Sequence, residues 1–126
     1  MDKKIRSVEE LFVYQKAREF SRKISELIKQ LPEIEKFRLK DQMRRAKLSL
    51  TNNIAEGYGR FHYKENIQYC RQSRGSLFEL IDDFNECFDE EYIDENICNN
   101  YKKDAYELLK ILNSYIASLK KSSSIT

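Results

Sequence analysis

The residue types that most often carry catalysis or bind metals are scarce in this sequence. Its single histidine is His62, and its three cysteines, Cys70, Cys87 and Cys98, include no Cys-x-x-Cys pair. A zinc site would lack well-spaced ligands, so we expect no metal and no cofactor. Because their number is odd, the cysteines are better explained as small buried side chains in a reducing compartment than as disulfides.

The segment most suggestive of chemistry is NNIAEGYGR, residues 52–60, which holds two of the three glycines. A dinucleotide-binding Gly-rich turn needs a strand before it and a helix that begins at the glycines. Here a helix is predicted to end at the glycines, and His62 stands where a third glycine would be. We therefore predict structural roles, with Gly57 at a close helix crossing and Gly59 as a left-handed C-terminal cap.

Three polar residues, Asn53, Glu56 and Arg74, lie on or beside predicted inner positions. The role we expect for them is a hydrogen-bond network that fixes the register of the helices. Arg60 and Lys64 are the candidate partners of a buried Glu56. The alternative role for Glu56 is a catalytic carboxylate, but no histidine or second clear carboxylate accompanies it, and we do not expect an enzyme.

The elements that position these residues are all predicted to be helices, because apolar residues recur at spacings of three and four and no segment alternates with a period of two. The four helices are expected at about residues 8–31, 39–58, 63–88 and 95–120, with Ser7 and Asp94 as N-caps. Their predicted inner stripes are Val13, Ala17, Phe20, Ile24, Leu27 and Leu31; Leu39, Met43, Ala46, Leu50, Asn53 and Gly57; Tyr63, Ile67, Cys70, Arg74, Leu77, Ile81, Phe84 and Phe88; and Ile97, Tyr101, Ala105, Leu108, Leu112, Tyr115 and Leu119. The fold class is therefore all-α, an antiparallel up-down-up-down four-helix bundle over residues 1–121 with a frayed tail at 122–126.

Charge is segregated along the chain. Residues 36–74 carry ten Lys and Arg against three acidic residues, a balance of +7, whereas residues 75–107 carry two against eleven, a balance of −9. Such a surface can steer an anionic partner to one end; alternatively, the two blocks pair with each other within one molecule or between subunits. No apolar run approaches the length that spans a membrane, and the start of the chain does not resemble a secretory signal. We expect a cytoplasmic protein without a membrane partner.

Basic residues of the second and third predicted helices are candidates for contacts with nucleic-acid phosphate. Without interleaved aromatic residues, such binding would depend on backbone and shape and show little sequence preference. The alternative is an ordinary solvated face. The candidates are Lys40, Arg44, Arg45, Lys47, Arg60, Lys64 and Arg71, and the surface could extend to Lys16, Arg18, Arg22 and Lys23 of the first helix.

The second predicted helix also carries a second apolar face, which a bundle helix does not need. We favour burial of this face between subunits over an unusually wide stripe inside one molecule, because so much apolar surface on a monomer would be a liability. On the third helix, the small residues Ser73 and Ser76 lie between Tyr69 and Leu80, where another helix could approach closely. The predicted oligomer interface is Leu48, Thr51, Ile54, Ala55 and Tyr58.

Two segments carry a family resemblance: DQMRRAKLSLTNNIAEGYGR (41–60) and ENIQYCRQSRGSLFEL (65–80). They resemble the bacterial four-helix-bundle proteins encoded in 23S rRNA intervening sequences, and LFVYQKAREFSRKI near the start and EEYID before the last helix also fit. Where this family typically has Ile-Pro, the chain has Leu50-Thr51, so a helix kink expected from the proline is missing. The resemblance implies an antiparallel four-helix bundle, often assembled as a ring of five. It extends to accessory proteins of diversity-generating retroelements, whose rings bind nucleic acid and a reverse transcriptase.

These observations favour a non-enzymatic homo-oligomer, expected to be a pentamer, that associates with RNA or DNA. By the resemblance, a reverse transcriptase is a further partner. The alternative is an oligomeric scaffold that binds a protein without touching nucleic acid, because a dedicated nucleic-acid binder usually has a larger positive excess than the net charge of +2 found here.

Overall fold

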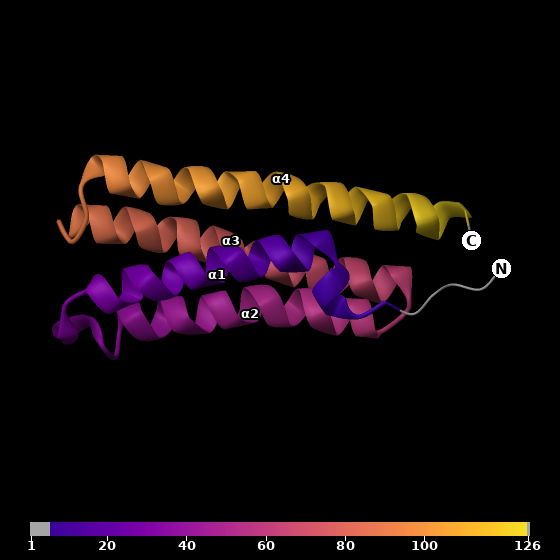
Figure 1. The fold of residues 1–126 in the computed structure, drawn as a ribbon, viewed down its shortest axis with the longest axis horizontal. Helices are drawn as coiled ribbons and strands as arrows, with labels where there is room; N and C mark the ends of the chain where they lie inside the picture. The colour runs from indigo at the N-terminus through magenta and orange to yellow at the C-terminus, as the bar shows by residue number, and fades with distance from the viewer. Residues whose placement is uncertain (1–5, 126) are drawn as a thin grey trace.

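The computed structural model describes residues 6–125, and every regular element within them is a helix. The body consists of α1 (Phe12–Gln30), α2 (Leu39–Gly59), α3 (Tyr63–Asp89) and α4 (Glu95–Ile125). Two 3-10 turns, η1 (Val8–Glu10) and η2 (Glu33–Glu35), precede α1 and α2. Figure 1 shows the four helices side by side, with the α1–α2 and α3–α4 connections at one end and the α2–α3 turn at the other.

The direction of neighbouring helices is visible in the contacts between α3 and α4. Arg74 Nη1 donates to Asn113 Oδ1 at 2.8 Å, whereas Lys102 Nζ donates to Asn85 Oδ1 at 3.0 Å, so later residues of α3 contact earlier residues of α4. The contacts between α2 and α3 described below show the same reversal. The predicted all-α four-helix bundle is therefore confirmed, and its connections give the up-down-up-down order (Figure 1).

The core is formed by the predicted inner stripes, whose apolar members are mostly buried. The rings of Phe20 and Phe84 meet edge to face with centroids 6.3 Å apart, which joins α1 to α3 at the centre. Two predicted core residues, Phe88 and Ile97, are instead each 39% exposed. They lie close to the α3–α4 connection, where Cys87 and Cys98, one residue away from each, occupy the inner positions.

The helix ends agree with the prediction at Asp94 and differ from it at Ser7. Asp94 Oδ1 accepts a hydrogen bond from the Ile97 backbone N–H at 2.8 Å, which confirms Asp94 as the N-cap of α4. Ser7 precedes η1 and makes no side-chain capping bond, and α1 begins only after Leu11. The fourth helix continues beyond its predicted end near Lys120 to Ile125, and the fraying of its last residues stays a prediction.

The predicted left-handed cap at Gly59 is wrong. No described glycine has a positive φ, and Gly59 is the last residue of α2. The left-handed conformation falls instead on Phe61, with φ of 60°. The chain therefore turns from α2 into α3 two residues later than the glycine suggested.

Candidate nucleic-acid interface

The motif NNIAEGYGR lies where α2 meets the beginning of α3. A Cβ atom added to Gly57 would lie 2.7 Å from Asn66 Oδ1 and 3.0 Å from Tyr69 Cβ, so a side chain would push the two helices apart. Asn66 Nδ2 in turn donates to Tyr115 Oη at 3.0 Å, which links the same point to α4. A Cβ on Gly59 would meet nothing within 4 Å, so the two glycines of the motif have different surroundings.

Glu56, considered above as a buried carboxylate, is exposed and paired. Its Oε2 lies 2.9 Å from Arg60 Nε, and Arg60 also reaches Glu65 at 3.6 Å. The guanidinium lies 5.1 Å from the centroid of the Tyr69 ring and donates to Tyr69 Oη at 2.8 Å. The hydrogen bond to Glu56 is the main cause that raises the pKa of Arg60. Lys64, the other candidate partner of Glu56, does not take part in this ion pair.

A shallow surface hollow of about 580 Å³ opens beside this motif. Its single carboxylate is Glu56, which Arg60 already neutralises, and Asn53 Nδ2 is held by Ser49 O at 2.9 Å. Such a lining offers amide and phenol groups for polar contact but no base beside a nucleophile. The lining residues are Asn52, Asn53, Ala55, Glu56, Gly59, Arg60 and Tyr69.

The three cysteines are free and buried, as predicted. Burial raises the pKa of Cys70 to about 11 and that of Cys87 to about 12, so these two are protonated thiols at neutral pH. Burial also raises the pKa of Cys98. Within residues 6–125, no group of three or more His, Cys, Asp or Glu side chains could hold a metal ion, and no helix is long and apolar enough to cross a membrane.

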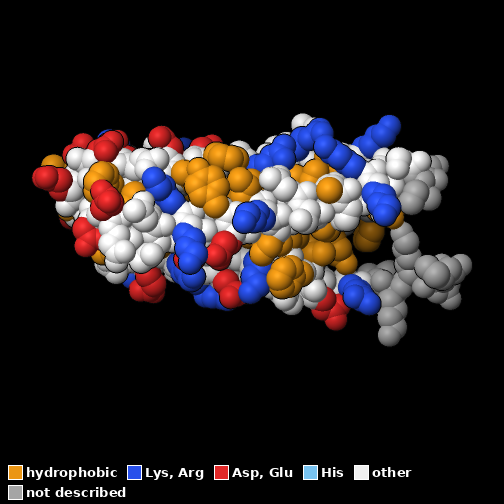
Figure 2. Space-filling model, turned by 90° about the horizontal axis from the view of Figure 1, so that it is seen from above, with side chains coloured by type: hydrophobic (Ala, Val, Ile, Leu, Met, Phe, Trp, Pro, Cys, Tyr) orange, Lys and Arg blue, Asp and Glu red, His pale blue; other side chains and the backbone are white. Residues whose placement is uncertain are grey.

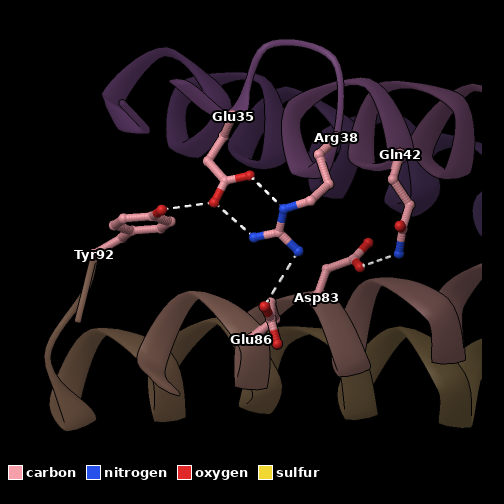
Figure 3. A network of polar contacts seen from close by, with 6 residues as sticks. All are labelled: Glu35, Arg38, Gln42, Asp83, Glu86 and Tyr92. Carbon is pink, nitrogen blue, oxygen red and sulfur yellow. Dashed lines mark hydrogen bonds and ion pairs between the residues drawn. The ribbon is translucent and has the colours of Figure 1, made fainter. Parts of the chain in front are cut away.

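A polar network occupies the opposite end of the α2–α3 pair, and sequence reasoning did not find it (Figure 3). Arg38 donates through Nε and Nη2 to the two oxygens of Glu35, at 2.7 and 2.6 Å, and through Nη1 to Glu86 of α3 at 3.2 Å. Tyr92 Oη donates to Glu35 Oε2 at 2.6 Å. These hydrogen bonds, that of Arg38 first, lower the pKa of Glu35 to about 2. The same carboxylate raises the pKa of Tyr92 to about 12.

Asp83 lies in the same region and is 1% exposed. Gln42 Nε2 donates to Asp83 Oδ1 at 2.6 Å, but Oδ2 has no hydrogen-bond partner in the described part of the chain. Burial, followed by the neighbouring carboxylates of Asp82 and Glu79, raises the pKa of Asp83 to about 7. Figure 3 shows the carboxyl group between α2 and α3, close to but separate from the Glu35–Arg38 pair. The double acidic residue in LIDDF, beside a core stripe, was the available sequence signal.

The seven predicted phosphate-binding residues differ in whether they are buried and whether an acidic side chain neutralises their charge. Lys40 is 7% exposed, and its Nζ lies 3.8 Å from Glu33 Oε2. Arg45 is paired with Asp41 at 3.3 Å, and Arg60 is held as described above. The four without an ion-pair partner among residues 6–125 are Arg44, Lys47, Lys64 and Arg71.

These four unpaired residues lie on different sides of the α2–α3 pair. A helix turns by about 100° per residue, so Arg44 lies about 200° around α2 from Gln42, whose side chain reaches α3. Arg71 likewise lies about 200° around α3 from Ser73, whose hydroxyl donates to Leu50 O of α2 at 2.6 Å. Arg44 therefore points away from α3, and Arg71 points away from α2. The predicted phosphate-binding residues of α2 and α3 thus do not form one continuous surface.

On the α2 side, two arginines of α1 complete a cationic surface. Arg18 and Arg22 are exposed and lie about 200° around α1 from Phe20, which lines a hollow against α4. Arg22 is as many residues from the last residue of α1 as Lys47 is from the first residue of α2. Because α1 and α2 run antiparallel, these two side chains lie at a similar level along the bundle axis. We call Arg18, Arg22, Arg44 and Lys47 the α1/α2 basic face. None of them has an ion-pair partner in the described chain.

Two of the five residues of the predicted oligomer interface are used inside the bundle. Thr51 is 4% exposed and Ile54 is fully buried, whereas Ala55 and Tyr58 are partly buried and only Leu48, at 57%, is well exposed. The wide stripe within one molecule, which we had considered the weaker interpretation, therefore accounts for Thr51 and Ile54. The physical reason is that α2 packs against both α1 and α3, so two of its sides are covered.

The small residues of α3 also serve the protomer. Ser73 is fully buried against the Leu50 carbonyl, and Ser76 Oγ donates to Ser49 Oγ at 2.8 Å. They allow α2 and α3 to lie close together, a contact that we had assigned to another subunit.

Charge is unevenly distributed over the surface of the molecule. On the face that Figure 2 shows, acidic side chains gather towards the end where α3 passes into α4, and basic side chains gather towards the opposite end. Apolar side chains lie between them, over the middle of the molecule.

The fold and the motif region together define a small four-helix-bundle protein. The chain belongs to the family of 23S rRNA-intervening sequence proteins, whose model matches residues 9–114. It is also similar to the crystal structure, at 1.70 Å resolution, of a protein with unknown function from the S23 ribosomal protein family from Bacteroides thetaiotaomicron VPI-5482. That likeness has a TM-score of 0.75 and 26% sequence identity, and covers 82% of this chain and 97% of the other. No curated protein matches the chain.

Proposed function

We propose that this protein is a non-enzymatic homo-oligomer that associates with RNA through the α1/α2 basic face. The observation that carries the proposal is the group of four cations on that face, none of them neutralised by a described carboxylate. Elsewhere on the molecule, Lys16, Lys23 and Lys29 have acidic partners within 3.4 Å. Cations without such partners are available to phosphate.

The chemistry of this face suits a nucleic-acid backbone. Arginine presents a planar fork of donors that matches a phosphate group, and three of the four residues are arginines. Each protomer offers only a few contacts, so binding depends on several copies acting together, as the proposed self-association provides. The family membership is in keeping with this proposal, and a ring of five is the assembly that the resemblance implies.

The experiment is a titration of labelled RNA followed by fluorescence anisotropy over a range of salt concentrations. In the variant R18Q/R22Q/R44Q/K47Q we expect weaker binding to unrelated RNA sequences by a similar factor. The dependence of log K on log salt should also fall by about one unit for each lost contact, because fewer counterions are released.

The matched control removes the same charge from another surface. K103Q/K110Q/K120Q/K121Q takes four exposed lysines from α4 and should change the salt slope much less. Equal losses in both variants would mean that net charge, and not this face, governs binding. If the wild-type protein fails to bind RNA at low salt, the proposal is rejected and the protein-binding scaffold is favoured.

A further inference from the structure

The hollow beside the motif NNIAEGYGR has no part in the function proposed above. Its volume of about 580 Å³ lies within the range of sites that hold small organic groups. Two of its lining residues, Ala55 and Gly59, have one side-chain carbon or none, and a Cβ on Gly59 would meet nothing within 4 Å. The space is therefore open to a group from another molecule.

Arg60 and Tyr69 together line one part of the hollow. The guanidinium lies 5.1 Å from the centroid of the Tyr69 ring, and its hydrogen bonds to Tyr69 Oη and Glu56 fix its position. The Arg60 side chain is still 43% exposed. Guanidinium planes and aromatic rings are the flat surfaces on which unpaired nucleobases stack.

Asn52 and Asn53 add amide groups to the lining. An amide contains both donors and an acceptor, so it can bond the edge of any base without selecting one. The sequence showed no interleaved basic and aromatic residues because Arg60 follows α2 and Tyr69 lies on α3, nine residues later. The fold brings the two side chains together.

The charge of the hollow fits a base better than a phosphate. Its two charged lining residues, Glu56 and Arg60, neutralise each other at 2.9 Å. The cations of the α1/α2 basic face, in contrast, have no ion-pair partner among residues 6–125. A nucleotide has the same two parts, an uncharged base and a charged phosphate.

The hollow continues the α1/α2 basic face along α2. Each step of four residues, from Arg44 to Leu48 and on to Asn52, advances about 6 Å along the helix and turns by about 40°, so the three lie along one side of α2. Leu48 is 57% exposed. A strand whose phosphate contacts Arg44 can pass over Leu48 and reach the hollow about 12 Å further along.

We propose that the hollow binds an unpaired nucleobase of an RNA strand whose phosphates contact the α1/α2 basic face. The base stacks against Arg60 and Tyr69. Its edge bonds the amides of Asn52 and Asn53. This inference rests on the proposed RNA association and deepens it, because it specifies single-stranded RNA as the ligand. A base inside a duplex is already stacked and paired and does not enter.

Filling the hollow is the direct test. Gly59→Leu places a side chain in the open space, and the backbone accepts it because φ of Gly59 is not positive. Binding is measured by fluorescence anisotropy with a labelled single strand of about a dozen nucleotides that cannot pair with itself. We expect binding to weaken by about tenfold or more, because the stacking of one base contributes a factor of this order.

Gly75→Leu is the matched control. A Cβ on Gly75 would also meet nothing within 4 Å, and Gly75 lies about 200° around α3 from Ser73, which contacts α2. The same side chain is therefore added outside the hollow, and the affinity for the single strand should not change. Equal losses of affinity in Gly59→Leu and Gly75→Leu would overturn the inference.

The salt dependence distinguishes a lost base contact from a lost phosphate contact. Gly59→Leu removes no cation, so the slope of log K against log salt should keep its wild-type value, whereas R18Q/R22Q/R44Q/K47Q should lower it. An RNA duplex of the same length should bind equally well to wild-type and Gly59→Leu protein. A lower slope in Gly59→Leu, or an equal loss of affinity for duplex and single strand, would overturn the inference.

Arg60→Lys tests the stacking surface at constant charge. Lysine keeps the positive charge of arginine but lacks its planar group. The affinity for the single strand should therefore fall several-fold at every salt concentration. Unchanged affinity in Arg60→Lys would overturn the inference.

Two further measurements exclude other occupants of the hollow. By light scattering, the Gly59→Leu particle should have the size of the wild-type particle, and a smaller particle would overturn the inference because another subunit would then fill the hollow. Adenosine monophosphate should displace the labelled RNA only at millimolar concentrations. Displacement at micromolar concentrations would indicate a site for free nucleotides and would also overturn the inference.

The failure of this inference can be told apart from the failure of the proposed function. Steeply salt-dependent RNA binding that is unaffected by Gly59→Leu would overturn the base site and leave the RNA-associated function in place. Failure of the wild-type protein to bind RNA at low salt would reject both.

Discussion

The two ends of the α2–α3 pair are held together by different means. At the end where α2 passes into α3, the buried contact between the helices depends on shape, because Gly57 leaves space for Asn66, and the Arg60 ion pairs at this end lie on the exposed surface. At the other end they meet through charge, with Arg38 bridging Glu35 and Glu86. The buried contact at the Gly57 end should therefore lose stability when side-chain volume is added and respond little to pH. The contact at the Glu35–Arg38 end should respond to pH and be less sensitive to volume.

The largest effect is expected from filling the space at Gly57. In Gly57→Leu, a Cβ already lies 2.7 Å from Asn66 Oδ1 before the rest of the side chain is added. Overpacking of this kind costs about 1–3 kcal/mol or more. Thermal unfolding followed by circular dichroism should show the lower melting temperature at every pH. An unchanged melting temperature would mean that α2 and α3 do not meet here.

A smaller loss, confined to one pH range, is expected at the charged end. Glu35 has its pKa lowered to about 2, so its contribution to stability is complete above its ordinary pKa near 4.5 and is lost as pH falls towards 2. Glu35→Gln should therefore lower the melting temperature at pH 7, and the difference should shrink in acid.

Glu33→Gln is the matched control for Glu35→Gln. The Glu33 side chain is 78% exposed and lies 3.8 Å from Lys40 Nζ, so the substitution should have little effect. Equal effects of the two substitutions would show that the burial of Glu35 and its bond to Arg38 do not matter.

Asp83 should give a dependence of the opposite sign. Its pKa is raised to about 7, so its contribution is complete below its ordinary pKa of 3.8 and is lost as pH rises towards 7 and above. Asp83→Asn should thus unfold at a higher temperature than the wild type at pH 8 and at a similar temperature at pH 4. Asp82→Asn, on the exposed side of the same helix, should show a smaller change. A difference that does not vary with pH would mean that Asp83 does not change its protonation in this range.

The close contact at Gly57 could be predicted from the sequence, whereas the Glu35–Arg38 ion pair at the other end of the α2–α3 pair could not. Helical periodicity gave the four stripes, and Gly57 fell on the inner stripe of α2, where a close approach was expected. The Glu35–Arg38 pair lies in a connection that carries no periodicity, and Glu35 also accepts a hydrogen bond from Tyr92, 57 residues away in the sequence. No local pattern reports a contact of that kind.

The remaining differences follow from how many neighbours a helix has. Thr51 and Ile54 looked like a second, unpartnered face because the pattern was compared with one inner stripe. In the bundle α2 is covered by α1 and α3, so its buried arc is wider than a single stripe. The phase of each helix was predictable, whereas the width of its buried arc was set by tertiary packing.

The smallest change in stability is expected at Gly59, the second glycine of the motif NNIAEGYGR. Gly59 ends α2 with an ordinary helical backbone and open space around its Cα, in contrast to Gly57 two residues earlier. Gly59→Ala should therefore fit without strain and stabilise the fold by about 0.4–1 kcal/mol, because alanine loses less conformational freedom on folding. Chemical denaturation with urea can resolve a shift of this size if the slope of the transition is unchanged. A clear loss of stability would show that position 59 needs a glycine and that the difference between the two glycines does not hold. A gain in stability accompanied by weaker self-association would instead indicate that the open space at Gly59 is occupied by another subunit.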